Sequence, residues 1–165
     1  MIRLLEKFYQ SKIGLFYFKL ANFASHYMVS LLVLFIRIWM ARIFWYSGLS
    51  KISDIPATIY LFEYEYKVAC IPPEIAAYLS TAIELSMPVF LIIGLFSRLA
   101  SIPLIVMTLI IRLTYPDLVE HAYWLFLLST IVFYGSGKLS LDYFIYSKIH
   151  KQNVRTIQTQ RAVDI

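Results

Sequence analysis

A single glutamate, Glu84, lies near the middle of the long apolar stretch EIAAYLSTAIELSMPVFLIIGLFSR, residues 74–98. The stretch holds roughly 20 residues of hydrocarbon-compatible sequence, which is enough to cross a bilayer as a helix. An unpaired carboxylate at that depth costs about 3 kcal/mol or more, so we expect Glu84 to face protein and to have a cationic partner. Pro88 follows four residues later and lacks an N–H group, so the Glu84 carbonyl also loses its helical hydrogen bond.

Three arginines in the neighbouring apolar stretches are the candidate partners: Arg37, Arg42 and Arg112. The depth of each charged residue in the membrane can be counted from the end of its span on the lysine- and arginine-rich side, at about 1.5 Å per residue. Glu84, Arg42 and Arg112 then fall near one level, and Arg37 lies somewhat shallower. An arginine side chain reaches about a turn along a helix and pairs with a carboxylate through two parallel hydrogen bonds. We therefore predict an arginine–glutamate cluster with a small polar cavity between the first three spans.

This cluster has two interpretations that the residues leave open. It can be a structural clamp that fixes the register of three helices, which is a well-attested use of buried charge. Three arginines against one glutamate would, however, leave excess positive charge inside the membrane. Cavity water, lipid headgroups, or an anionic or quinone-like ligand would relieve that excess. The charge balance slightly favours the interpretation that the cluster holds a ligand.

Other residues with chemical potential form weaker patterns. His121 follows Glu120 closely, but the spacing is not typical of a metal site, so we expect an interfacial histidine and no metal. Cys70 is the single cysteine, which excludes an intramolecular disulfide and a multi-cysteine metal site. No nucleophile–base set, phosphate-binding loop, haem-ligand pair or nucleic-acid-binding face is evident. We predict no catalytic residues and no nucleic-acid partner.

The composition places these residues in a membrane protein. Of the 165 residues, 60% are hydrophobic and only 15% are charged, and the mean hydropathy is +0.69. The apolar residues come in long blocks rather than in amphipathic stripes, so the lipid bilayer is the first expected partner. The net charge of +5 does not indicate nucleic acid, because the basic residues flank the apolar blocks.

The apolar blocks predict an all-α fold, an integral membrane four-helix bundle. The predicted spans are about residues 28–49, 75–96, 99–115 and 122–137, within one domain of residues 28–145. Residues 1–27 form a basic segment that either lies in the headgroup region as an amphipathic helix or only fixes orientation. Residues 146–165 form a basic tail.

The distribution of basic residues predicts the orientation. Segments 1–27, 97–98 and 138–165 hold ten lysines and arginines, whereas the two opposite loops hold only Lys51 and Lys67. The positive-inside rule then places both termini in the cytoplasm.

Four sequence motifs in this order resemble the DoxX family of small membrane proteins: RIWMARIFWYSGLSKI, an acidic aromatic loop, ELSMPVFLIIGLFSRLASIPL and GSGKLSLD. The resemblance covers about residues 34–145. The stretches LFEYEYKVACIPPEIAAYLSTAIEL and TYPD look like a proteobacterial subgroup. The resemblance implies a multi-pass four-helix bundle in the bacterial inner membrane. Relatives include the membrane subunits of thiosulfate:quinone oxidoreductase and members that assemble with soluble redox enzymes.

The resemblance also marks individual positions. The matching residues are Arg37, Gly48, Lys51, Glu84, Gly94, Arg98, Gly137 and Asp142. Arg112 stands where the family pattern leads us to expect a neutral polar residue such as glutamine, so its pairing would be peculiar to this chain.

These observations favour an accessory or anchor subunit of a redox or detoxification system, without activity of its own. We expect no intrinsic cofactor, leave open a contact with quinone, and expect a soluble or membrane oxidoreductase subunit to supply the cofactor.

One alternative is a small transporter or channel for an anion or weak acid. Four helices are few for alternating access, so a transporter would need a homo-oligomer. The second alternative is a purely structural scaffold.

Overall fold

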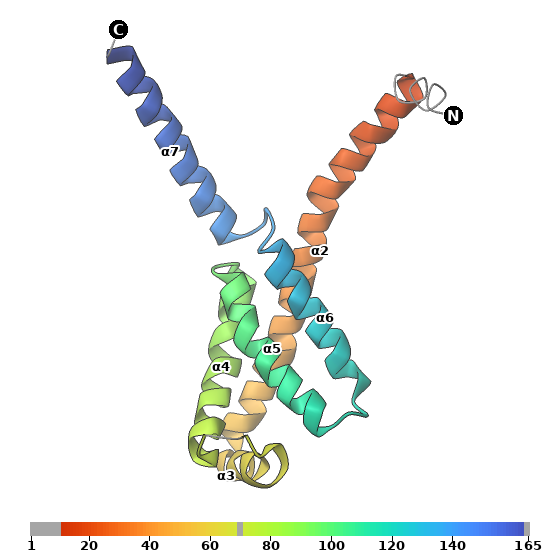
Figure 1. The fold of residues 1–165 in the computed structure, drawn as a ribbon, viewed down its shortest axis with the longest axis vertical. Helices are drawn as coiled ribbons and strands as arrows, with labels where there is room; N and C mark the ends of the chain where they lie inside the picture. The colour runs from red at the N-terminus through yellow and green to blue at the C-terminus, as the bar shows by residue number, and fades with distance from the viewer. Residues whose placement is uncertain (1–10, 69–70, 164–165) are drawn as a thin grey trace.

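The computed structural model describes residues 11–68 and 71–163, and every regular element in them is a helix (Figure 1). The helices are α2 (Lys12–Ser53), α3 (Ile55–Tyr60), the π-helix η1 (Leu61–Tyr66), α4 (Pro73–Ile93), α5 (Ser97–Thr114), α6 (Val119–Tyr134) and α7 (Leu141–Val163). The prediction of an all-α fold is therefore confirmed. Residues 1–10 of the predicted N-terminal segment and Cys70 lie outside the described residues.

Four helices pack into a ring around one apolar core. Helix α2 packs against α4 and α6, and α5 packs against the same two helices (Figure 1). The core residues are Ile36, Met40, Ala41, Phe44, Leu91, Ala100, Leu104, Leu128 and Ile131. The small residues Ala41 and Ala100 favour a close approach of neighbouring helices. The inner face of α2 thus lies between α4 and α6.

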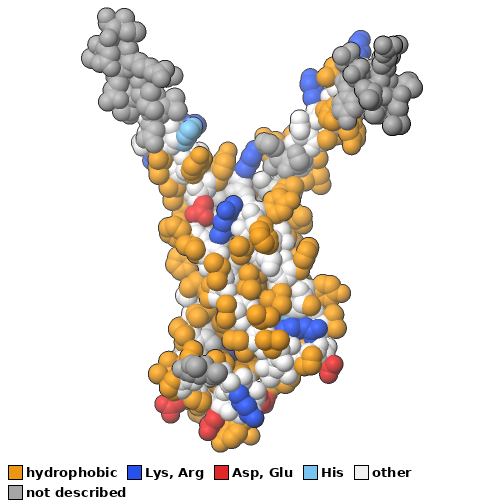
Figure 2. Space-filling view, viewed as in Figure 1, with side chains coloured by type: hydrophobic (Ala, Val, Ile, Leu, Met, Phe, Trp, Pro, Cys, Tyr) orange, Lys and Arg blue, Asp and Glu red, His pale blue; other side chains and the backbone are white. Residues whose placement is uncertain are grey.

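Three of these helices are long and apolar enough to cross a membrane: α2, α4 and α5. Helix α6 has 16 residues, fewer than the roughly 20 of a typical span, so the fourth crossing remains a prediction. Large apolar side chains cover much of the visible outside of the ring, as expected for a surface that faces lipid (Figure 2). The chain is a multi-pass membrane protein by these criteria.

Helix α2 is longer than the predicted first span. It runs without interruption for 42 residues, from Lys12 to Ser53, which is about 63 Å at the usual helical rise. The side chain of Ser11 caps its start by accepting a hydrogen bond from the Gly14 N–H group at 3.1 Å, and no proline interrupts it. The N-terminal part of α2 projects beyond the ring and diverges from α7 (Figure 1). Residues 12–27 of the basic segment and the first span are therefore joined in one helix.

The two ends of the ring differ in their connections. What we call the terminal end carries the α4–α5 turn (residues 94–96), the α6–α7 loop (residues 135–140) and the two projecting helices. The loop end carries α3, η1 and the α5–α6 turn. Figure 2 shows most of the visible acidic side chains at the loop end, and the exposed acidic residues there are Asp54, Glu63, Glu65, Glu74, Asp117 and Glu120. This asymmetry agrees with the charge distribution in the sequence, and the placement of the termini in the cytoplasm remains a prediction.

Candidate functional site

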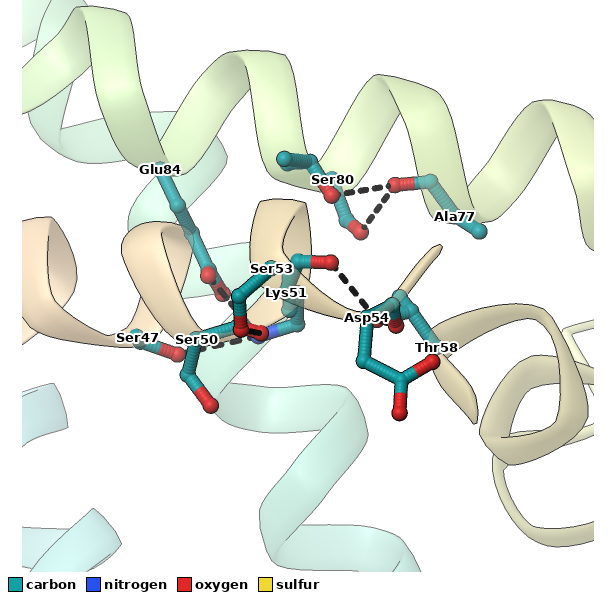
Figure 3. Close-up of polar contacts among 10 residues, drawn as sticks. Ser47, Ser50, Lys51, Ser53, Asp54, Thr58, Ala77, Ser80 and Glu84 are labelled. Carbon is teal, nitrogen blue, oxygen red and sulfur yellow. Dashed lines mark hydrogen bonds and ion pairs between the residues drawn. The ribbon is translucent and has the colours of Figure 1, made fainter. Parts of the chain in front are cut away.

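Glu84 pairs with Lys51 and not with an arginine (Figure 3). The Lys51 Nζ atom donates to both carboxylate oxygens of Glu84, at 2.8 and 2.7 Å, and to the Ser47 hydroxyl at 2.9 Å. Glu84 is 1% exposed and the Lys51 side chain is 12% exposed. The predicted arginine–glutamate pairing is therefore wrong, although the expectation of a cationic partner is confirmed.

Gly48 explains why Lys51 reaches Glu84. A Cβ atom at Gly48 would lie 2.9 Å from Leu85 Cδ2 and 3.1 Å from Glu84 Cβ. Because Gly48 has no side chain, α4 approaches α2 closely at this point, and Lys51 follows one helical turn later. The predicted span ended at residue 49 and left Lys51 in a loop, whereas α2 continues to Ser53. The sequence feature that could have indicated Lys51 as the partner of Glu84 is its position on the same face of the helix as Gly48.

Helix α3 holds the end of α2 in place beside this pair (Figure 3). The Thr58 hydroxyl donates to the carbonyl oxygens of Lys51 and Asp54, at 3.2 and 2.9 Å. The Asp54 carboxylate caps α3 by accepting a hydrogen bond from the Ala57 N–H group at 3.0 Å. The backbone of Lys51 is thus fixed before its side chain reaches toward α4.

Arg37 is fully buried and donates all of its described hydrogen bonds to main-chain carbonyls. In the last turn of α4, Leu91 O accepts from Nε at 2.7 Å and Ile92 O accepts from Nη2 at 2.8 Å. In the α6–α7 loop, Ser136 O and Leu139 O accept from Nη1 at 2.7 and 3.1 Å. Carbonyls at a helix C-terminus lack helical donors and carry partial negative charge, so they suit a cation. We call this arrangement the Arg37 clasp.

Asp142 joins the first turn of α7 to the same region. Its carboxylate accepts from the Phe96 N–H group at 3.0 Å and from the Ser136 hydroxyl at 2.6 Å, and its own N–H group donates to Gly94 O at 3.1 Å. Gly94 and Phe96 have φ angles of 75° and 49°, in the left-handed region. Asp142 therefore fixes the α4–α5 turn, in which Phe96 adopts a backbone conformation unfavourable for a non-glycine residue.

The family-motif positions thus meet in two places. Gly48, Lys51 and Glu84 form one cluster, while Arg37, Gly94 and Asp142 meet at the terminal end. Two further positions, Arg98 and Gly137, also lie at the terminal end. A Cβ atom at Gly137 would lie 3.6 Å from Ser30 Cα, so the α6–α7 loop rests on α2 there, and Arg98 lies against Gly135.

The remaining cluster arginines, and His121 as a separate weaker candidate, lie apart from Glu84. Arg42 is exposed on the outside of α2, with its guanidinium 5.8 Å from the centre of the Tyr46 ring. Arg112 is in the last turn of α5, and its Nη1 atom is buried without a hydrogen-bond partner among the described residues. His121 is buried, with its ring centre 4.4 Å from that of Trp124. The three arginines therefore do not converge.

A pocket of about 270 Å³ lies beside the Lys51–Glu84 pair, bounded mainly by α4, α5 and η1. Its walls are almost entirely apolar and include Phe62, Ile83, Val106, Met107, Ile110 and Ile111. The predicted cavity was polar, so the prediction of its lining is wrong. Because Lys51 neutralises Glu84, the pair contributes no net charge, and the pocket suits an uncharged apolar ligand better than an anion.

Tyr66 of η1 forms one side of this pocket. Its ring makes edge contacts with Phe62 and Tyr115, with ring centres 5.1 and 6.3 Å apart. Burial, and next the charge of Glu84, raises the pKa of Tyr66, so the phenol stays protonated at neutral pH. π-Helical stretches such as η1 occur frequently at functional sites. Tyr66 can therefore act as a hydrogen-bond donor at the edge of the pocket.

Comparison with known proteins identifies a matching family model. The model of the DoxX family matches residues 32–116, a segment that contains Arg37 and the Lys51–Glu84 pair and ends before Gly137 and Asp142. No curated protein and no solved structure matches the chain.

The Arg37 clasp predicts that Gly94→Ala destabilises the protein more than Gly137→Ala. A methyl group at Gly94 would clash with Arg37 Nη2, whereas one at Gly137 meets no atom closer than 3.6 Å. Both positions have left-handed φ angles, so each substitution costs about 1 kcal/mol in backbone strain. We expect a further loss of about 2 kcal/mol for Gly94→Ala, measured by unfolding in detergent. Equal losses would contradict the clasp.

The Lys51–Glu84 pair predicts coupling in a double-mutant cycle. Lys51→Met and Glu84→Gln should each destabilise the protein by about 3 kcal/mol, because each leaves a buried polar group without its partner. The double variant should lose much less than the sum of the two. Lys148→Met, at an exposed position of α7, is the control and should change stability by less than about 0.5 kcal/mol. Additive losses would show that the two side chains do not interact.

Proposed function

Because the chain belongs to the DoxX family, we propose that it is an accessory or anchor subunit of a redox or detoxification system in the bacterial inner membrane and that it contacts a quinone. The observation that carries the ligand assignment is the apolar pocket whose edge is formed by Tyr66 and the neutral Lys51–Glu84 pair. A quinone headgroup is an uncharged ring with carbonyl acceptors. It matches an apolar wall with a few polar groups at its edge.

The pocket supports a ring-sized headgroup with a tail that runs into lipid. Its volume of about 270 Å³ is slightly below the range of about 300–1,000 Å³ typical of sites for larger ligands. Leu79 and Val106 at its lining are each 50% exposed, so the pocket opens to the outside of the ring. The three protons of Lys51 Nζ are used by Glu84 and Ser47. Tyr66 is therefore the donor that we assign to a quinone carbonyl.

The loop end supports the assignment of a partner. Tyr60 and Tyr64 are 58% and 54% exposed, and their ring centres lie 4.5 Å apart. Exposed carboxylates, Glu63 and Glu65, lie beside them. Aromatic residues are enriched at protein interfaces, and tyrosine buries much area with little loss of side-chain freedom. We assign this surface to the oxidoreductase partner.

The two alternatives have less support. Transport of an anion relied on excess positive charge in a polar cavity, but Arg37 donates to carbonyls and Lys51 is paired with Glu84. A purely structural scaffold accounts for the Arg37 clasp but gives no reason for an open apolar pocket beside a buried ion pair.

Filling the pocket should weaken quinone binding. We expect decylubiquinone to raise the unfolding temperature of the purified chain. In Val106→Phe the same rise should require at least about tenfold more decylubiquinone, because the added ring occupies the apolar space. Val89→Phe is the matched control, since Val89 is 41% exposed and lies outside this pocket. A response of Val106→Phe equal to that of the unmodified chain would exclude this pocket as the quinone site.

A photoreactive phenylalanine derivative should identify the partner surface. Placed at Tyr64 in the native host, it should cross-link an oxidoreductase subunit, which mass spectrometry would identify. Tyr123, which is 66% exposed on α6, is the control position and should give no such product. Cross-links from Tyr64 to copies of this chain alone would contradict the assignment and indicate a homo-oligomer.

A further inference from the structure

A second pocket, of about 410 Å³, lies at the terminal end between the α4–α5 turn, the α6–α7 loop and the first turns of α7. Its lining includes Arg98, Asp142 and the three tyrosines Tyr134, Tyr143 and Tyr146. Figure 2 shows a basic and an acidic side chain next to each other near this end of the ring. The pocket thus combines charged and hydroxyl-bearing side chains with the apolar side chains of Phe96 and Leu99, whereas the pocket near the loop end is almost entirely apolar.

Arg98 is positioned in this pocket but is not paired. A Cβ atom at Gly135 would lie 2.9 Å from Arg98 Nε and 3.0 Å from Nη2, so the guanidinium rests on the glycine backbone. Among the described residues, Arg98 forms no hydrogen bond or ion pair. Both carboxylate oxygens of Asp142 are engaged elsewhere, by the Phe96 N–H group and the Ser136 hydroxyl. The pocket therefore presents a guanidinium whose donors are free.

The position of Arg98 along the helices matches the headgroup layer. It is the second residue of α5, and α4 ends after 21 residues at Ile93, which is about the length that crosses the hydrocarbon core. Phe96 and Leu99 on either side of it are 61% and 63% exposed, as expected for side chains that contact acyl chains. Tyrosines are enriched at this level of a membrane, where their rings meet lipid and their hydroxyls meet headgroups.

We propose that this pocket binds the phosphate of an anionic phospholipid. Arg98 holds the phosphate through its planar fork of N–H donors. Tyr143 and Tyr146 line the same pocket, and we assign their hydroxyls as donors to the headgroup, while the acyl chains run along Phe96 and Leu99. Since Arg98 belongs to α5 and the two tyrosines to α7, the bound lipid joins α7 to the ring. This site is separate from the quinone pocket and does not rest on the proposed function.

Lipid binding to the full chain tests the proposal. The delipidated protein in mild detergent is titrated with phosphatidylglycerol or phosphatidylcholine of identical acyl chains, and bound lipid is measured by native mass spectrometry. We expect phosphatidylglycerol to bind at least about fivefold more tightly. Arg98→Gln should remove this preference, and Arg98→Lys should reduce it because the fork of donors is lost. Arg42→Gln, at the exposed arginine on the outside of α2, should keep the preference.

Four outcomes would overturn the proposal. An unchanged preference in Arg98→Gln would exclude Arg98 as the phosphate ligand, and an equal loss in Arg42→Gln would indicate diffuse surface charge. Full retention of the phosphatidylglycerol preference in Arg98→Lys would show that a point charge suffices. That result is expected for a residue that only sets the orientation of the chain in the membrane. Displacement of the lipid by excess inorganic phosphate would identify a free-anion site. Because Arg98 is exposed and unpaired, we expect its variants to fold. Measuring the unfolding temperature of each variant verifies this.

Discussion

The architecture depends on one buried cation that is satisfied without a carboxylate. Arg37 is fully buried at the terminal end of the ring, where an unpaired charge would be prohibitively costly. Its donors are directed at carbonyls of the last turn of α4 and of the α6–α7 loop. A helix C-terminus offers such acceptors together with a favourable dipole. Since one side chain from the middle of α2 binds two elements distant in sequence, the clasp fixes α2 relative to the C-terminal end of α4 and to the α6–α7 loop.

The second buried charge, on Glu84, is satisfied in a different way and has a different consequence. Lys51 approaches it from the far end of α2, at the point where Gly48 lets α4 come close. The result is a neutral polar edge on an apolar pocket rather than a charged cavity. This neutrality shifts the expected ligand from an anion to an uncharged ring, and it is the reason for assigning quinone over anion transport.

Four of the cations in and near the apolar region thus have different environments. Arg37 is bound by carbonyls, Lys51 by a carboxylate, and Arg42 lies over an aromatic ring at the outer surface. Arg98 is held in a polar pocket with its donors free. Residue type and depth do not distinguish these environments, because each environment depends on which groups of the neighbouring elements contact the cation. The free donors of Arg98, at headgroup level, are therefore the ones suited to a ligand from the membrane itself.

Apolar block length and charge placement in the sequence by themselves determined the all-α membrane fold and the positions of α4 and α5 to within a few residues. They also determined that Glu84 needs a cation, because the cost of a buried carboxylate does not depend on its partner. Only the tertiary structure decided that the cation is Lys51, since this depends on α2 continuing to Ser53 and approaching α4 at Gly48. It alone also decided the role of Arg37, because main-chain carbonyl acceptors are present at every residue and leave no signature in the sequence.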